Sequence, residues 1–597
     1  MNIESPLLAS PLLGEVLRPE MTILIGIVLL IVVPNLGNAT IRIPMTKFRI
    51  PVFLGGRRFT ATSDPLIPGV ISMFVLLLSM AASLMTFVDG HELVNVCISA
   101  SGAIQQGCTG SDYILRSDPY SRLFTTIFFF ALLLGTAAMI NRMPAFVDAK
   151  APHPDDTGAT RIHAIRRLLN NRRQGDFHLL ILFVALGMSI VALSTHLFLL
   201  FIGLELASLA IYVLVAFMKE DETSGEAATK YFLTGSVASA ITLYGMSLLY
   251  VWSGSASNYA TASLSLVGPN GLAATWQAMD SIDPLAAIGF GMVLVGFGFK
   301  ISAVPFHFAA PDAYSGTSAP MALILATASK AMGFAALIRI LIVMAMPEYG
   351  AEATWLILVG ILSVVTMTWG NLAALSTENP KRMLAYSSVA HAGYLLAALA
   401  ALGSGMAGAA TSRLLVTAVV FHLLVLSFFK SGAFLVLTLT EMKGDDTNKM
   451  ESLYGLGRRD PIMAAAMFVF MLALAGVPPL SGFLSKFLVI DGIVTASTAS
   501  GSLSAGGAIE WLSSVHWVFW LAVAMAVNSA LSLFYYLRIG QVMFFETPRS
   551  IRPLPEAPMI RIAVILCLFL TVLAGLGPFS QTLVDMATMA AQELLRV

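Results

Sequence analysis

The chain has 597 residues, of which 57% are hydrophobic and only 11% charged, with a mean hydropathy of +0.82. A soluble domain carries about 25% charged residues, so this composition excludes a soluble globular protein and predicts a polytopic membrane protein. The 34 basic residues balance the 34 acidic ones, which leaves no basic surface for nucleic acid, and three cysteines are too few for a zinc or iron–sulfur cage.

Apolar runs long enough to cross a bilayer follow one another along the chain and predict an all-α fold of about 14 transmembrane helices. The first run follows an acidic, proline-containing lead, so we expect a retained helix rather than a cleaved signal peptide. The predicted spans are 21–36, 67–87, 121–140, 178–195, 197–218, 229–251, 281–306, 319–345, 353–375, 383–402, 414–438, 461–480 continuing to about 495, 516–537 and 560–578.

Lysine and arginine alternate between rich and poor connections, which predicts the orientation of the spans. The first and third connections are strongly basic, whereas 252–280 and 497–515 contain neither residue. The positive-inside rule, by which connections rich in lysine and arginine lie in the cytoplasm, places both termini on the outer side of the membrane. Cys97 and Cys108 share the second, outer connection, where an oxidising compartment would allow a disulfide between them. The long basic connection 141–177 could dock a partner subunit or anionic lipid, or remain a solvated loop.

Two predicted spans contain helix breakers at mid-membrane depth. The seventh reads FKISAVPFHFAAPDAYSG and the twelfth LAGVPPLSGFLSKF. Proline removes a backbone hydrogen bond, and in lipid the freed carbonyl groups must face protein or water. Paired interruptions in two halves are typical of inverted-repeat transporters, and the matching AVP and GVP breaks support that interpretation. We therefore predict two inverted five-helix repeats, 178–345 and 346–540, after an N-terminal segment 1–177 and before a last helix in 541–597.

Charged side chains inside the predicted spans are the candidate functional residues, because a charge at mid-membrane depth costs about 3 kcal/mol. The set is Glu205, Lys300, Lys330, Lys430 and Lys486. Lysine, unlike arginine, can lose its proton in a protein, so a carboxylate that moves toward or away from a buried lysine could switch it between holding and releasing a proton.

Other protonatable residues could extend such a path. His307, His391 and His422 lie at or near membrane depth and suit proton relay, although a satisfied core histidine is an equally good interpretation of each. Lys230 opens its helix, where it could join the path or anchor the helix at the interface.

Several ordered motifs resemble the antiporter-like membrane subunits of respiratory complex I. GLELASLAIYVLVAF, EAATKYFLTGSVASAITLYGMSLLY, FKISAVPFHFAAPDAYSGTSAP and LILATASKAMGF occur in the family's order, and GNLAALSTENPKRMLAYSSVAHAGYLL is especially similar to subunit N of NADH-quinone oxidoreductase. The resemblance covers roughly residues 115–545. It implies a glutamate–lysine pair at Glu205 and Lys300, a central lysine at Lys330, a terminal lysine at Lys486 and a sixth-helix lysine at Lys230.

The resemblance also implies a function in proton translocation within a prokaryotic cell membrane. NADH or another donor, FMN, iron–sulfur clusters and quinone would belong to partner subunits of the membrane and peripheral arms, and this chain would hold no cofactor. Lys430 stands where many subunit N chains lack a lysine. A subunit of a multisubunit cation/proton antiporter, a related hydrogenase or ferredoxin-driven complex, or a non-conducting scaffold are the alternatives.

Overall fold

A computed structural model places most of the chain in long helices. It describes residues 17–32, 40–42, 49–51, 66–88, 94–98, 104–106, 114–140, 157–218, 222–256, 262–278, 283–345, 354–403, 408–498, 516–548 and 553–595. Cys108 lies outside these ranges, so the disulfide with Cys97 stays a prediction.

Each of the predicted spans coincides with a helix, or with two helices joined at a break. In the first half the helices are α1 (Arg18–Val32), α2 (Leu66–Val88), α3 (Pro119–Met139), α4 (Thr157–Leu193), α5 (Leu197–Val215), α6 (Glu222–Ala256), α7 (Leu272–Gln277), α8 (Pro284–Ile301), α9 (Ala309–Gly316), α10 (Ala319–Ile324), the π-helical turn η4 (Leu325–Ser329) and α11 (Lys330–Ala345). In the second half they are α12 (Thr354–Ser376), α13 (Pro380–Ala401), α14 (Ala409–Met442), the 3₁₀ turn η5 (Met450–Leu453), α15 (Leu456–Arg459), α16 (Pro461–Ala475), α17 (Ser481–Thr498), α19 (Trp517–Phe544), α20 (Pro558–Leu573) and α21 (Gly577–Leu594).

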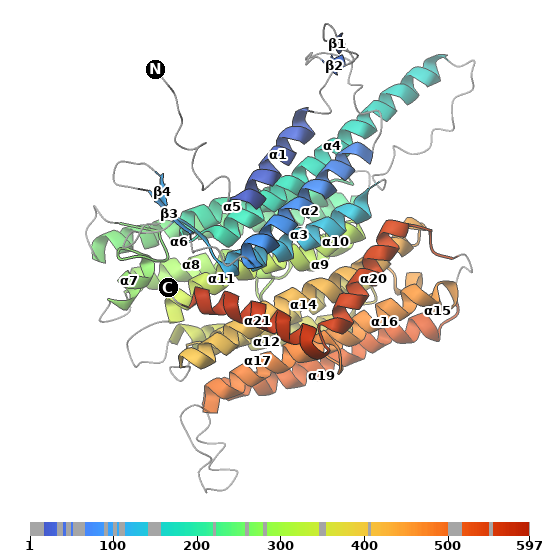
Figure 1. Cartoon of the computed structure of the whole chain (residues 1–597). Coiled ribbons are helices and arrows are strands. Elements are labelled where there is room, and N and C mark those ends of the chain that lie inside the picture. The colour runs from blue at the N-terminus through green and yellow to red at the C-terminus, as the bar shows by residue number, and fades with distance from the viewer. Residues whose placement is uncertain are drawn as a thin grey trace.

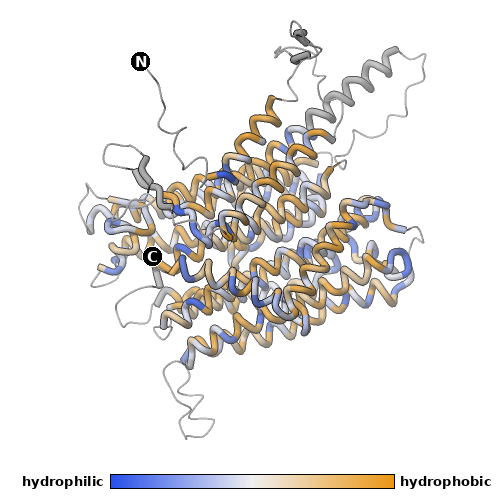
Figure 2. Tube along the Cα trace, in the orientation of Figure 1, coloured by the Kyte–Doolittle hydropathy of each residue, from blue (hydrophilic) through white to orange (hydrophobic). Residues whose placement is uncertain are grey.

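Within the described ranges, 11 helices are long and apolar enough to cross a membrane, and α20 with α21 brings the number to 12 if that bent pair counts as one span. Two of the predicted spans are represented by shorter helices, α1 and α16, of 15 residues each. The all-α, multi-pass prediction is confirmed, whereas the count of 14 stays a prediction. Apolar residues run along the helices and hydrophilic residues gather toward their ends (Figure 2).

Short strands lie outside the helical body. β1 (Thr40–Arg42) pairs antiparallel with β2 (Arg49–Pro51), and β3 (Val94–Ile98) pairs with both β4 (Ile104–Gln106) and β5 (Leu115–Ser117). Both small sheets belong to the connections before and after α2, so they do not change the helical class.

Two helices extend beyond the predicted spans. α4 begins at Thr157, so the second part of the connection 141–177 is helical rather than a loop. α21 follows α20 at a bend of 88° and packs against α14 and α3 (Figure 1). Its apolar residues recur on one face among many polar ones, which lowers the local hydropathy and hides it from a search for apolar spans. The C-terminal helix thereby joins the N-terminal segment to the second half.

The two helix breaks have the same backbone geometry. Ser302 caps the end of α8 and Gly476 the end of α16, both in the left-handed region with φ of 60° and 86°. The next N–H donates back five residues in both cases, from Ala303 to Gly298 O at 2.8 Å and from Val477 to Leu472 O at 3.0 Å. These are Schellman caps, which satisfy carbonyl groups that the helix end leaves unpaired.

The caps correct the register that the sequence suggested. Ser302 aligns with Gly476, so Pro305 corresponds to Pro479 and not to Pro478, and the AVP–GVP match is off by one residue. The left-handed cap, rather than the first proline, is the feature that the two breaks share. The inverted five-helix repeats that contain them, and the division at 178, 346 and 541, stay predictions.

Candidate functional site

Lys330 and Lys430 meet at one serine in the centre of the bundle. Lys330, at the start of α11, donates from Nζ to the backbone oxygen of Ser388 on α13 at 2.6 Å. Lys430, midway along α14, hydrogen-bonds with the hydroxyl of the same Ser388. Both lysines are almost fully buried, at 2% and 0% exposure. Lys430, the residue with the weakest family support, therefore lies at the centre of the site.

The backbone around Lys330 departs from the regular helix. The π-helical turn Leu325–Ser329 comes directly before it. Such turns are rare and occur often at functional sites, because the inserted residue leaves carbonyl groups free and redirects side chains.

Two of the predicted histidines form a buried pair next to these lysines. His391 Nδ1 on α13 lies 3.0 Å from His422 Nε2 on α14, and His391 Nε2 lies 3.4 Å from the hydroxyl of Tyr536 on α19. The Tyr536 hydroxyl is in turn 2.6 Å from Ser387 Oγ. Since each of these groups can both donate and accept, the row can pass a proton by exchanging hydrogen bonds.

Lys486 of α17 lies at the second helix break. Its Nζ donates to the backbone oxygen of Ala475, the last residue of α16, and to Ser529 Oγ, each at 2.9 Å. It also lies 5.5 Å from the centre of the Tyr394 ring. The carbonyl that the broken helix exposes is thus a ligand for the lysine ammonium group.

Lys300 and Glu205 lie in the first half but do not form an ion pair. Lys300 Nζ on α8 donates to the Tyr212 hydroxyl at 3.3 Å, and Glu205 on α5 accepts from Ser239 Oγ at 2.6 Å. Tyr212 follows Glu205 by seven residues on α5, which places it about 10 Å further along the helix. Lys300 is therefore hydrogen-bonded to the tyrosine and not to the carboxylate.

A small internal cavity lies beside Lys300 and Ser329, the residue that precedes Lys330. Its volume is about 10 Å³, and its lining includes Lys300, Tyr231, Tyr314 and Ser329. Tyr314 belongs to α9, which packs against α13, the helix that carries Ser388. A cavity of this size can hold about one water molecule, within reach of Lys300 and the two tyrosines that line it.

Among the described residues, no ion pair with a carboxylate forms at Lys300, Lys330, Lys430 or Lys486. A fifth buried lysine, Lys381 at the start of α13, differs from them, because it pairs with Glu441 at 3.2 Å. An ammonium group buried without a counter-ion costs several kcal/mol, and a second one nearby adds repulsion. The number of protons on Lys330 and Lys430 is therefore a property of the pair, because a proton on one raises the free energy of a proton on the other. We refer to the row from Glu205 through Lys300, Lys330, Lys430 and the histidine pair to Lys486 as the buried lysine row.

Two predicted residues do not join the buried lysine row. His307, inside the first break, packs its ring against Phe308 and against Trp369 of α12. Lys230 lies at a surface pocket, with its side chain 49% exposed and paired with Glu226 and Asp312. Within the described ranges, no three His, Cys, Asp or Glu side chains gather as they would around a metal ion.

The sequence-based inventory of intramembrane charges missed a second buried cluster. Arg122 of α3 donates from a terminal nitrogen to Glu20 Oε1 of α1 at 2.9 Å, and Ser189 of α4 donates to the same oxygen at 2.5 Å. Arg339 of α11 donates to Ala192 O at 2.9 Å and lies 3.8 Å from Asp118, which caps α3. These charges lie close to the ends of their spans, where sequence alone cannot distinguish a buried ion pair from an interfacial anchor.

Gly476 is required in the second break for two reasons. Its φ of 86° strains any residue with a Cβ atom, at about 1–2 kcal/mol, and an added Cβ would lie 2.9 Å from Lys486 Cδ. We expect Gly476→Ala to lower the stability of the protein by about that amount and to displace Lys486. Ser302→Gly, at the corresponding cap, is the matched control and should stabilise by roughly 1 kcal/mol or less. Thermal unfolding of the two variants measures both shifts, and equal midpoints would contradict the prediction.

The chain matches known membrane proteins over most of its length. The family model described as "NADH:quinone oxidoreductase/Mrp antiporter, TM" matches residues 194–509. NADH-quinone oxidoreductase subunit N 2 of Sorangium cellulosum is 37% identical over 75% of this chain and 79% of that protein, and F(420)H(2) dehydrogenase subunit N of Methanosarcina mazei is 35% identical over 73% and 80%.

Solved structures agree with this result. A chain of respiratory complex I from Thermus thermophilus has a TM-score of 0.63 and 28% identity, covering 93% of this chain and 96% of that one. A chain of the Mrp complex from Dietzia sp. reaches 0.69 at 20% identity, covering 98% and 97%, which shows a common fold alone. This chain therefore belongs to the antiporter-like membrane subunits of the NADH:quinone oxidoreductase and Mrp antiporter family, as a relative of subunit N.

Proposed function

We propose that this chain is a proton-translocating, non-redox subunit in the membrane arm of a complex I-like oxidoreductase. Quinone reduction would take place on other subunits, which would also carry NADH or another donor, FMN and the iron–sulfur clusters. This chain would convert the released free energy into proton movement. The relatives named as subunits of NADH-quinone oxidoreductase support this assignment.

The observation that carries the proposal is the buried lysine row. Lys300, Lys330, Lys430 and Lys486 are each at most 6% exposed, and within the described ranges they form no ion pair with a carboxylate. Lys330 and Lys430 meet at Ser388, and hydroxyl groups of Tyr212 and Ser529 bind Lys300 and Lys486. A purely structural core would not place four costly ammonium groups in sequence through both halves of the bundle, because apolar residues of similar volume would be at least as stable.

The proposed setting is a prokaryotic cell membrane, with both termini on the outer side, as the distribution of lysine and arginine predicts. The exposed apolar faces of the helices would contact lipid and the neighbouring membrane-arm subunits.

A cation/proton antiporter subunit is the second candidate, because the Mrp chain shares the fold. A membrane-bound reductase is similar too, since a chain of the archaeal sulfane sulfur reductase has a TM-score of 0.69 at 20% identity. Genes for a quinone site and iron–sulfur subunits beside this one would favour the oxidoreductase, and a cluster of antiporter genes would favour the alternative.

Replacing Glu205 with glutamine tests the proposal with little change of shape. Glutamine can still accept the hydrogen bond from Ser239 but cannot take up or release a proton. We expect Glu205→Gln to leave assembly intact and to lower proton pumping by this subunit about tenfold or more. The measurement is acidification of inverted membrane vesicles during quinone reduction. The exposed Glu546→Gln is the control, and equal pumping by both variants would contradict a role for Glu205.

A further inference from the structure

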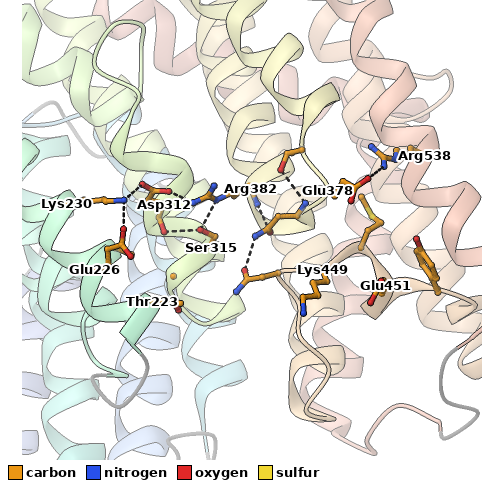
Figure 3. A pocket seen from close by; sticks show the side chains of 17 residues that line it. Thr223, Glu226, Lys230, Asp312, Ser315, Glu378, Arg382, Lys449, Glu451 and Arg538 are labelled. Carbon is orange, nitrogen blue, oxygen red and sulfur yellow. Dashed lines mark hydrogen bonds and ion pairs between the residues drawn. The ribbon is translucent and has the colours of Figure 1, made fainter.

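A charged pocket of about 630 Å³ opens at the ends of α6, α9 and α13, beside η5 and α19 (Figure 3). Its lining carries four basic and four acidic side chains, including Lys230, Asp312 and Arg382. A pocket of this volume with polar walls accommodates many water molecules. It lies at the helix ends that the lysine and arginine distribution assigns to the cytoplasmic side.

Asp312 of α9 is the carboxylate at which the two halves meet in this pocket. Lys230 of α6 donates to Asp312 Oδ2 at 3.1 Å, and Arg382 of α13 pairs with Oδ1. Arg382 also donates from Nε to Ser315 Oγ at 3.2 Å. Glu226 is the other carboxylate on Lys230, at 2.6 Å, and is 67% exposed, whereas the Asp312 side chain is 25% exposed. Asp312 is thus the more enclosed of the two acids.

Two helices separate this pocket from the internal cavity beside Lys300. On α9, Asp312 and Ser315 line the pocket, while Ala313 and Tyr314 line the cavity. On α6, Lys230 lines the pocket and its neighbour Tyr231 lines the cavity. α6 and α9 therefore form the wall between the pocket and the cavity beside Lys300.

We propose that Asp312 is the proton-uptake group of this chain, with the charged pocket as its vestibule. Asp312 takes up a proton from water in the pocket and gives it up, past Tyr314, to the cavity beside Lys300, where the neutral amine of Lys300 accepts it. Lys230 and Arg382 are positioning residues that hold the carboxylate over the wall, so Lys230 acts through Asp312 rather than as a member of the buried lysine row. The inference rests on the proposed proton-translocating function.

The test uses the whole complex in inverted vesicles, where the buffer sets the pH on the cytoplasmic side. Asp312→Asn should lower pumping about tenfold or more, with the loss growing as the buffer pH rises from 6 to 8.5, because a carboxylate near the pathway collects protons when they are scarce. Asp312→Glu, which keeps the carboxylate, should retain most of the pumping. Asp585→Asn, an exposed aspartate on α21, should pump like the unaltered complex.

A role for Asp312 as a mere link between the two halves makes different predictions. Lys230→Met removes the contact of Asp312 with α6 but leaves its ion pair with Arg382. If Asp312 takes up protons, this variant should show only a mild pumping defect. If Asp312 only links the two halves, it should lose as much pumping as Asp312→Asn. A pH-independent loss in Asp312→Asn would also overturn the proposal. If Asp312→Asn pumps fully while Lys330→Met is inactive, proton uptake at Asp312 is rejected but the translocation function stands. If both variants pump fully, the translocation function itself is rejected.

Discussion

Replacing Lys330 with methionine is expected to reduce proton flux through this subunit about 100-fold or more. The assembled complex should then lose the fraction of its proton pumping that this subunit carries out. Methionine fills the volume of the lysine stem but can neither carry a proton nor donate to Ser388 O, the contact that Lys330 makes at 2.6 Å. The chain should still assemble, because the variant removes an uncompensated buried ammonium group. Protons pumped per electron, measured with a pH dye in inverted vesicles, give the result.

Lys430 provides the internal check on that result. Because Lys330 and Lys430 share Ser388, we expect Lys430→Met to impair pumping as well, and the double variant to be no worse than Lys330→Met alone. Residues that act as a unit show such non-additive effects. The exposed Arg413→Met, outside the buried lysine row and the charged pocket, is the control. Multiplicative losses in the double variant would mean that the two lysines act independently, and full pumping by assembled Lys330→Met would reject its central role.

Breaking the buried pair of Glu20 and Arg122 is expected to be the most destabilising single change outside the buried lysine row. Removing one partner of a buried ion pair leaves the other charge uncompensated, at a cost of about 3–5 kcal/mol. Among the described residues, Arg122→Leu leaves Glu20 with the hydrogen bond from Ser189 alone, and no described residue bonds to its Oε2. We expect α1 to detach from α3 and α4, and the thermal midpoint of the detergent-solubilised complex to fall.

The double replacement Glu20→Leu with Arg122→Leu separates charge from packing. It removes both charges and should recover much of the lost stability, since apolar pairs often replace buried ion pairs without cost. A double variant less stable than Arg122→Leu, or an Arg122→Leu complex as stable as the original, would contradict this account. Pumping should be unaffected wherever the complex assembles, because the pair lies outside the buried lysine row.

The sequence by itself determined the membrane class, the helical architecture and most members of the row. Charges are rare in an apolar chain, so Lys300, Lys330, Lys430 and Lys486 stand out without any structure. The two breaks were equally visible, because proline and glycine act on the local backbone. What depended on local chemistry or on hydropathy could be predicted.

The tertiary structure decided which of these residues meet. Ser388, Tyr212 and Tyr536 are ordinary helix residues in the sequence, and they become parts of the buried lysine row only when α13, α5 and α19 pack against the lysines. His307 satisfied the same sequence criterion as His391, yet packing places its ring against Trp369. For Lys230, which opens its helix, the sequence left a role in the path and an interfacial anchor open, and the structure places it in the charged pocket. Contacts between residues 58 to 149 positions apart are set by how helices pack, and no local pattern encodes them.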